Sequence, residues 1–423
     1  MSTYELRAID AATLDEYCAG HPLGNYQQTS QMGALRQRQG AEVEYLGLFR
    51  DGELAAATVL ETYRSRLSTF CAVHDGPLCD FHDAELTKAM VDALGAHAKT
   101  NGAAQLEITP EFAYRVRDSY GAELPQDEGG APDDAALKAL TDAGCEHEGF
   151  TTGYTAVPRW RYLKDLTGFA TADELLASYA KKARRNVHVG EISCVRVERL
   201  PRERLGEFHA VCQMSAERQD YENRPLSYFE DIYDCFGDKA RFLAAYMDMD
   251  AYVKSLEEKR DHHLRDVERL SESIKTTKRL EATQRKLDEA KSAHGFTLKR
   301  LEDAAGYIER DGHKPILAVG LFVRHPREMV YLFSGSDDRY TKFCAPALLQ
   351  HHVMSACVEE GIDRYNFYGI DGVFDDPDDP GRGVLEFKQG FNGYVEELSG
   401  DFTLVLRPGV YHAKQLAHKI LGH

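Results

Sequence analysis

Residues 251–308 carry apolar or small side chains at alternating steps of three and four, the heptad spacing of helices that pack side by side. The positions are Val253, Leu256, His263, Val267, Leu270 and Ile274 and, after a break at Thr276 and Thr277, Leu280, Thr283, Leu287, Ala290, His294, Thr297, Leu301, Ala304 and Ile308. Such a seam needs a partner, and the nearest partner is the other half of the same segment. We therefore expect an antiparallel coiled-coil hairpin over residues 248–310, with arms roughly 35–40 Å long. Taken alone, it is typical of a spacer or dimerisation arm.

Strand-like runs at Arg241–Met247 and Pro315–Val323 flank this segment, so the hairpin is an insertion in an α/β chain. Before it, the pattern predicts strands at Tyr4–Ile9, Val43–Phe49, Leu54–Tyr63 (joined to the preceding strand by an Asp51-Gly52 turn), Phe70–Val73, Gln105–Ile108, Arg161–Asp165 and Cys194–Val197. Predicted helices there are Leu14–Cys18, Gln31–Gln39, Ala84–Ala98, one opened by the capping box Thr171–Glu174, Leu205–Glu217 and Tyr228–Cys235. After it come strands Ile316–Val323, Met329–Phe333, Tyr365–Tyr368 and Val395–Leu406, with a helix at Pro346–Glu360 and a short closing helix.

The same strand–helix–strands–helix–strand order occurs twice, which resembles tandem domains of the acetyl-CoA-dependent N-acyltransferase (GNAT) type. We expect an α/β (α+β) chain with a first domain at 1–157, to which 399–423 returns, and a second at 158–398. GNAT enzymes cradle a pyrophosphate with a Gly-rich turn at a helix N-terminus. The corresponding segment here, Gly335–Pro346, contains adjacent acids and a single glycine. Acetyl-CoA is therefore not the expected donor, and no cofactor is predicted.

Composition limits the function further. The 423 residues carry a net charge of −18, which argues against a protein that coats nucleic acid and predicts no DNA partner. Residues 251–308 have thirteen Lys/Arg against eleven Asp/Glu, so any RNA contact must be local. The nine cysteines form no CxxC pair, which favours reduced thiols and a cytoplasmic protein. An apolar signal segment and an eighteen-residue apolar run are both missing, so we expect neither secretion nor a membrane span. Peripheral membrane contact stays open.

The densest candidate chemistry is the stretch Gly381–Gly393, GRGVLEFKQGFNG, which we interpret as strand-like. Lys388 follows Phe387 and precedes Phe391 by three positions, so its charge is expected to be partly desolvated and able to stabilise a developing oxyanion. The alternative is a surface lysine whose stem packs while its charge stays in water.

Four features together resemble the Fem/Mur (FemABX-type) family, which builds the interpeptide bridges of bacterial peptidoglycan. They are the strand end at 365–370 with the run at 387–393, the basic helix at 181–186, the stretches at 217–220 and 224–229, and the coiled-coil hairpin carried by a subset of members. The resemblance covers nearly the whole chain. It implies a tRNA-dependent aminoacyltransferase that acts on the side-chain amine of residue 3 of the stem peptide. The partners it implies are aminoacyl-tRNA and either lipid II or UDP-MurNAc-pentapeptide.

The resemblance also implies roles for single residues. Arg36, Arg224, Tyr228 and Tyr331 would line the acceptor groove, where arginine suits bidentate contact with a diphosphate. Lys388, with Phe387, would be catalytic, in one cleft between the two domains that also holds Arg224. Lys181, Lys182, Arg184 and Arg185 would contact tRNA, or form a solvated helix face. Arg224 could instead pair with Glu222 or Glu230.

We expect direct attack of the acceptor amine on the ester of aminoacyl-tRNA, with Lys388 beside the oxyanion and Asp371 a candidate base by position only. Glu107 and Glu111 receive no catalytic role. Cys344, Cys357, His351 and His352 are expected to be packing residues, and no metal site is predicted because His412, His418 and His423 are not at ligand spacing. Two other functions stay open: an acyltransferase for a protein N-terminus or small amine, and a non-enzymatic scaffold.

Overall fold

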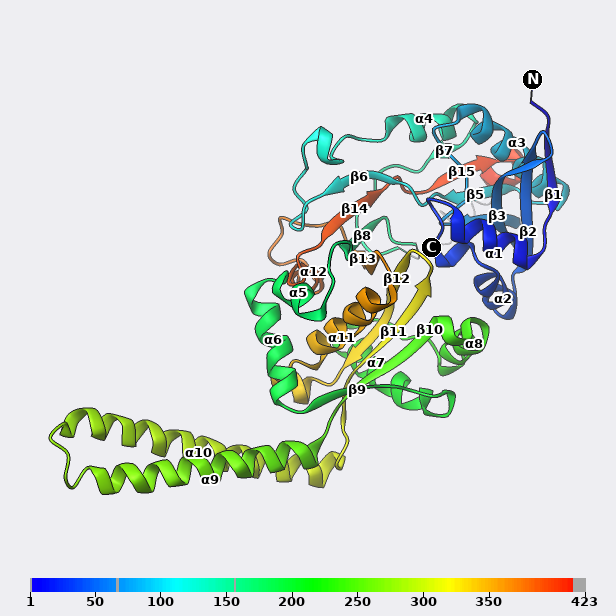
Figure 1. The fold of residues 1–423 in the computed structure, drawn as a ribbon. Coiled ribbons are helices and arrows are strands. Elements are labelled where there is room, and N and C mark those ends of the chain that lie inside the picture. The colour runs from blue at the N-terminus through cyan, green and yellow to red at the C-terminus, as the bar shows by residue number, and fades with distance from the viewer. Residues whose placement is uncertain (1, 66–67, 156, 414–423) are drawn as a thin grey trace.

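A computed structural model describes residues 2–65, 68–155 and 157–413. Two mixed β-sheets with helices on their faces form the body, and a helical arm projects from the second sheet (Figure 1). The expected residues His418 and His423, and the end of the closing helix, lie outside the described ranges.

The first sheet has the order β1-β2-β3-β4-β5-β15-β7. Its strands are β1 (Tyr4–Ala8), β2 (Glu42–Arg50), β3 (Glu53–Arg64), β4 (Thr69–His74), β5 (Gln105–Thr109), β15 (Phe402–Val405) and β7 (Glu146–His147). The associated helices are α1 (Ala11–Gly20), α2 (Ser30–Arg38), α3 (Ala84–Thr100) and α4 (Asp134–Asp142). Helix α3 begins where Asp83 caps the N–H of Leu86, and its apolar stripe packs against the sheet.

The second sheet has the order β6-β14-β8-β13-β12-β11-β10-β9. Its strands are β6 (Ala113–Arg117), β14 (Tyr394–Leu398), β8 (Trp160–Asp165), β13 (Arg364–Ile370), β12 (Glu328–Ser336), β11 (Ile316–His325), β10 (Ala240–Met247) and β9 (Val195–Arg199). Helices α5 (Ala172–Ala177), α6 (Lys181–Ile192), α11 (Ala345–Glu360) and α12 (Arg382–Gln389) accompany one buried core. Helices α7 (Leu205–Gln219) and α8 (Leu226–Phe236) accompany another, on the opposite face of β10–β12.

The two sheets repeat one plan. Four antiparallel strands in spatial order are followed by a helix and a strand parallel to the fourth: β4 and β5 around α3, then β12 and β13 around α11. The predicted fold class, a tandem α/β acyltransferase fold with an inserted helical arm, is confirmed. β15 returns to the first sheet, while β6, from within residues 1–157, joins the second sheet.

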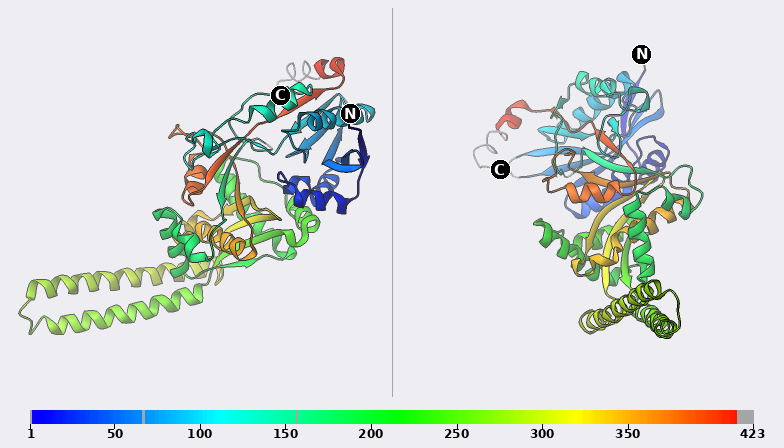
Figure 2. Two further views of the ribbon diagram at one scale, coloured as in Figure 1. Left: turned by 45° about the horizontal axis from the view of Figure 1, so that its top comes forward. Right: turned by 90° about the vertical axis from the view of Figure 1, so that its left-hand side faces the viewer.

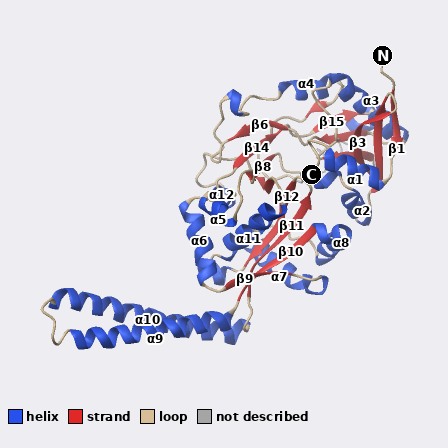
Figure 3. Cartoon of the chain, viewed as in Figure 1, coloured by secondary structure: helices blue, strands red, loops and turns tan. Residues whose placement is uncertain are grey.

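The arm consists of α9 (Met249–Ser273) and α10 (Leu280–Asp311), which run alongside each other away from the body in every view (Figures 1–3). The predicted seam positions are buried or half-buried except Leu280, which is 58% exposed because it begins α10 and has no facing turn. At 1.5 Å per residue, α9 is about 37 Å long, as expected, whereas α10 is about 48 Å long and exceeds the expected length. Tyr252 and Leu256, at the base of the arm, are buried in the core of the second sheet.

Two predicted strands are wrong. Residues 382–389 form helix α12, because Leu385 and Lys388 are buried one helical turn apart. The strand expected over Val395–Leu406 is divided into β14 and β15, which join different sheets, with Gly400 at φ +90° between them. Strand β6 and helix α4 are additions that the hydrophobic pattern did not predict. Within the described ranges, none of the helices is long and apolar enough to cross a membrane.

Candidate functional site

The centre of the second sheet opens between two parallel strands. β12 and β13 pair only through Glu328–Val330 and Arg364–Asn366, and then separate. Tyr368 has a left-handed backbone with φ +63°, an arrangement that costs about 1–2 kcal/mol for a residue with a side chain. The pairing of β13 with β8 is irregular at the same place, between Asn366 and Gly369. Strained backbone of this kind is concentrated at functional sites.

Helix α12 brings Lys388 to this opening. The ammonium group donates hydrogen bonds to the carbonyl oxygens of Gly369 (2.6 Å) and Tyr368 (3.3 Å). The side chain is 5% exposed, and burial lowers its pKa from 10.5 to about 7, although the nearby Asp371 acts in the opposite direction. A lysine with a pKa of about 7 can hold or release a proton near neutral pH.

Lys388 lines a hollow of about 360 Å³, here called the lysine hollow. Phe387 and Tyr331 line it as well, together with Tyr221 and Arg218 from the end of α7 and the segment after it. Burial raises the pKa of Tyr331 to about 12, so its hydroxyl remains a hydrogen-bond donor near neutral pH. The ring of Phe387 meets that of Phe391 edge to face, with centroids 5.4 Å apart, which helps to fix the end of α12.

Arg36, Arg224 and Tyr228 lie together around a second hollow of about 180 Å³, here called the arginine hollow. Arg224 lies two residues before α8 begins, and its guanidinium lies over the ring of Tyr228 in the first turn, 5.4 Å from the ring centroid. Among the described residues no carboxylate is within ion-pair distance of Arg224, and Glu230 is 3.6 Å from Arg202 instead. Arg36 is held 3.4 Å from the buried Glu61. The exposed charge of Arg224 is thus free to meet an anion.

Tyr368 links the two hollows through its side chain and its main chain. Its ring lines the arginine hollow, whereas its carbonyl oxygen accepts a hydrogen bond from Lys388. Leu332 and Phe333 of β12 line the arginine hollow, while Tyr331 and Ser334 line the lysine hollow. The single cleft expected to hold Arg224 and Lys388 is therefore two cavities, which share no lining residue although β12 contributes to both, and Tyr331 lies in the one with Lys388.

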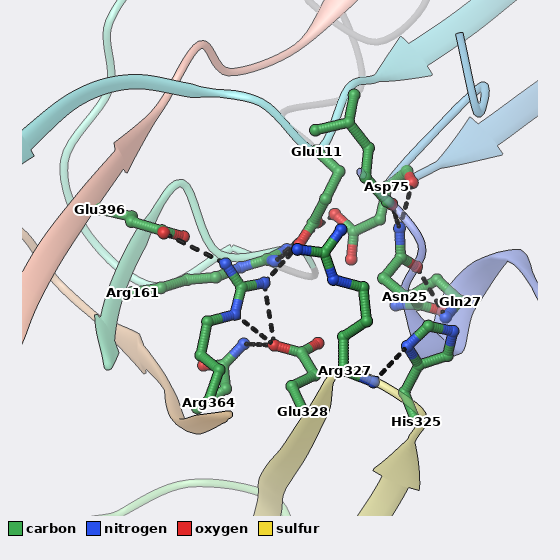
Figure 4. Close-up of polar contacts among 12 residues, drawn as sticks. Asn25, Gln27, Asp75, Glu111, Arg161, His325, Arg327, Glu328, Arg364 and Glu396 are labelled. Atoms are coloured by element: carbon green, nitrogen blue, oxygen red, sulfur yellow. Dashed lines mark hydrogen bonds and ion pairs between the residues drawn. The ribbon is translucent and has the colours of Figure 1, made fainter. Parts of the chain in front are cut away.

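A buried ion network joins the two sheets (Figure 4). Arg161 donates to Asp75 (2.7 Å) and Glu111 (2.6 Å), and its guanidinium lies 5.6 Å from the ring centroid of Tyr368. Tyr26 in turn donates from its hydroxyl to that of Tyr368, at 3.0 Å. Burial raises the pKa of Glu111, and Arg161 opposes that shift. Removing one partner of such a network typically costs about 3–5 kcal/mol, so Glu111 has a structural part here.

Four exposed cations follow one another on the first turns of α6: Lys181, Lys182, Arg184 and Arg185. The helix starts beside α12, because the N–H of Ala180 donates to the carbonyl of Gly390 at 3.0 Å. Arg185 is also close enough to Cys344, next to the lining residue Pro346, to oppose the rise in the pKa of that thiol. The basic turns therefore lie near the lysine hollow.

The remaining candidate residues Asp371, Cys357 and His351 lie beside the site or in the core. Burial and the neighbouring Asp379 raise the pKa of Asp371, which also accepts a hydrogen bond from the N–H of Val373. Cys357 and His351 are buried in α11, where His351 lies within hydrogen-bond distance of the hydroxyl of Tyr179 (3.2 Å). In the described ranges no group of His, Cys, Asp and Glu could hold a metal.

The sequence did not point to Tyr26, Tyr368 or Arg161, although all three line or support the site. A residue in a left-handed turn has no signature when it is not glycine, and the ion network joins positions far apart in the chain. The only available signal for Tyr368 was its place in the YNFYGI strand end.

Comparisons with known proteins agree with this architecture. The FemAB family model matches residues 9–419. Aminoacyltransferase FemA of Staphylococcus aureus, in strains bovine RF122 / ET3-1 and N315, is 26% identical over 414 residues, 94% of each chain. The crystal structure of FemX superposes with a TM-score of 0.78 at 22% identity, covering 97% of this chain and 99% of that one, and shows the same fold. As the sequence motifs predicted, the chain belongs to the FemAB family.

Proposed function

We propose that the chain transfers an amino acid from aminoacyl-tRNA to the side-chain amine of residue 3 of a peptidoglycan stem peptide, carried by lipid II or UDP-MurNAc-pentapeptide. The curated relatives of the FemAB family are aminoacyltransferases, which supports the class of reaction. The observation that carries the proposal is Lys388, which lines the lysine hollow and donates a hydrogen bond to the carbonyl of Tyr368, a residue that lines the arginine hollow.

Each hollow suits one substrate. The arginine hollow offers Arg224 and Arg36, which match the diphosphate of the acceptor, and Tyr228 beside them offers a ring for a sugar or base. The lysine hollow lies near the basic turns of α6, which match the phosphates of tRNA. The acceptor amine and the aminoacyl ester would then meet beside Tyr368.

The reaction needs no covalent enzyme intermediate. The amine nitrogen attacks the ester carbonyl, the tetrahedral oxyanion forms beside the ammonium of Lys388, and the ribose hydroxyl leaves with a proton. Preorganised donors of this kind are typically worth roughly 10²–10³ in rate each. Charged tRNA places the reaction in the cytoplasm, and a lipid-linked acceptor would place it at the inner membrane face.

The test offers the purified chain a set of charged tRNAs with each acceptor and identifies products by mass spectrometry. We expect one added aminoacyl mass on residue 3 of one acceptor. Transfer to protein N-termini or small amines instead, or no transfer from any charged tRNA, contradicts the proposal.

A further inference from the structure

The face of the first sheet that α3 does not cover is apolar where α1 packs on β3, but it is polar at β5 and β15. Alternation along β5 buries Leu106 and Ile108 in the core and directs Gln105, Glu107 and Thr109 to the opposite face. Thr403 of β15 is paired with Glu107 and therefore shares that face. This polar part of the sheet lies beside the arginine hollow. Its composition does not suit packing against an apolar helix or strand.

These side chains line a third hollow of about 350 Å³, here called the acidic hollow. Three carboxylates surround it: Glu107, Glu148 and Asp401. Of the described residues that line it, none is lysine or arginine. Thr109 donates its hydroxyl hydrogen to Asp401 at 2.7 Å, which fixes that carboxylate at the rim. The cavity offers hydrogen-bond acceptors and negative charge, a match for a cationic donor.

Gln105 supplies an independent sign that a donor is missing. It lines the acidic hollow and is 5% exposed. Its amide nitrogen donates a hydrogen bond to Glu107. Its amide oxygen is buried and has no hydrogen-bond partner. Buried polar atoms are nearly always paired, so an unpaired carbonyl oxygen beside carboxylates indicates a place for a donor group of a ligand.

The acidic hollow adjoins the arginine hollow, because His74 and Val157 line both. We propose that the acidic hollow binds a primary ammonium group carried by the acceptor peptide. The inference rests on the proposed function, in which the acceptor has a diphosphate at one end and an amine on its peptide. Neighbouring cavities of opposite charge match these two ends.

An ammonium has three donors and no acceptor, which suits Glu107, Asp401 and the amide oxygen of Gln105. It is bound there in its protonated form, and it gives one proton to water before the neutral amine reacts beside Tyr368.

The test measures binding of UDP-MurNAc-pentapeptide with a free lysine amine, and of the same molecule acetylated on that amine, by calorimetry. We expect the wild-type chain to bind the free amine about tenfold more tightly, the effect of one hydrogen-bonded charge pair. Glu107→Gln combined with Asp401→Asn should bring the ratio close to one. Glu146→Gln, which removes an exposed acid of β7 outside the hollow, should leave the ratio unchanged.

A ratio near one in the wild type, or a full ratio in the double variant, overturns the inference. The tripeptide L-Ala-γ-D-Glu-L-Lys, with and without acetylation, separates this failure from failure of the proposed function. If the nucleotide-linked acceptor does not bind at all, the proposed function fails, and the tripeptide ratio alone then decides whether the acidic hollow recognises an ammonium. Thermal unfolding of each variant confirms that it is folded.

Discussion

Replacing Lys388 by methionine should stabilise the protein near neutral pH while removing activity. Methionine keeps an unbranched stem of similar length without the charge. The difference between a pKa of 10.5 in the unfolded chain and about 7 in the folded one corresponds to roughly 5 kcal/mol. Loss of the two hydrogen bonds to Tyr368 and Gly369 offsets about 1–3 kcal/mol of that gain. A net gain of about 2–4 kcal/mol follows at pH 7 and below.

The pH dependence separates the two contributions. Between pH 7 and 10.5 the unfolded wild type binds a proton that the folded state does not, so wild-type stability rises with pH relative to the variant. The advantage of Lys388→Met should therefore shrink by about 1.4 kcal/mol per pH unit above pH 7, whereas the hydrogen-bond loss is nearly constant.

Urea unfolding at pH 6, 7, 8 and 9 measures this difference. Trp160 is the only tryptophan of the chain and lies buried in β8, so its fluorescence reports the sheet that holds Lys388. A difference in the free energy of unfolding that does not change with pH would show that Lys388 is not held in a desolvating environment. A role for Lys388 as a desolvated cation beside the oxyanion would then be excluded as well.

Three further predictions follow from the same contacts. The ratio of the wild-type single-turnover rate to that of Lys388→Met should fall about tenfold per pH unit above about 7, because the protonated lysine is lost while the titration of the acceptor cancels; a rising ratio would indicate a base. Arg161→Met leaves Asp75 and Glu111 buried without their partner and should lower the free energy of unfolding by about 3–5 kcal/mol in urea melts, against less than about 1 kcal/mol if the network is unimportant. Replacing residues 262–292 by a short glycine-rich turn keeps Tyr252 and Leu256 at the base of the arm, so the body should lose less than about 1 kcal/mol and keep its acceptor affinity; a larger loss in either measurement means the outer arm supports the body.

The predictable parts of the fold depend on local patterns. Period-two runs located most of the strands, and the three–four seam located the arm, because each element buries one face. The segment around Phe387 and Lys388 was predicted as a strand but is a helix, because glycines at 381, 383 and 390 conceal the helical spacing of Leu385 and Lys388. The break in the last strand at Gly400 was not predicted either, because it is evident only when β14 and β15 are seen to pair in different sheets.

The site divides in the same way. Lys388 and Arg224 could be recognised as chemically apt, but the stacking of Arg224 on Tyr228 was not predicted, because Arg224 lies before the helix that carries Tyr228. The partners of Lys388 are main-chain carbonyls, which no residue type encodes. The separation of Arg224 and Lys388 into two hollows depends on how far β12 and β13 diverge, a tertiary property that the sequence does not display locally.

The central claim is that Lys388 acts on the reacting bond while Arg224 holds the acceptor. Single-turnover transfer from charged tRNA to UDP-MurNAc-pentapeptide, measured over a range of acceptor concentrations, tests both parts at once. We predict that Lys388→Met lowers the maximal rate roughly 10²–10³-fold with acceptor affinity nearly unchanged. Arg224→Ala should weaken acceptor binding about tenfold with the maximal rate nearly unchanged. Full activity in Lys388→Met, or loss of maximal rate rather than affinity in Arg224→Ala, would contradict the account.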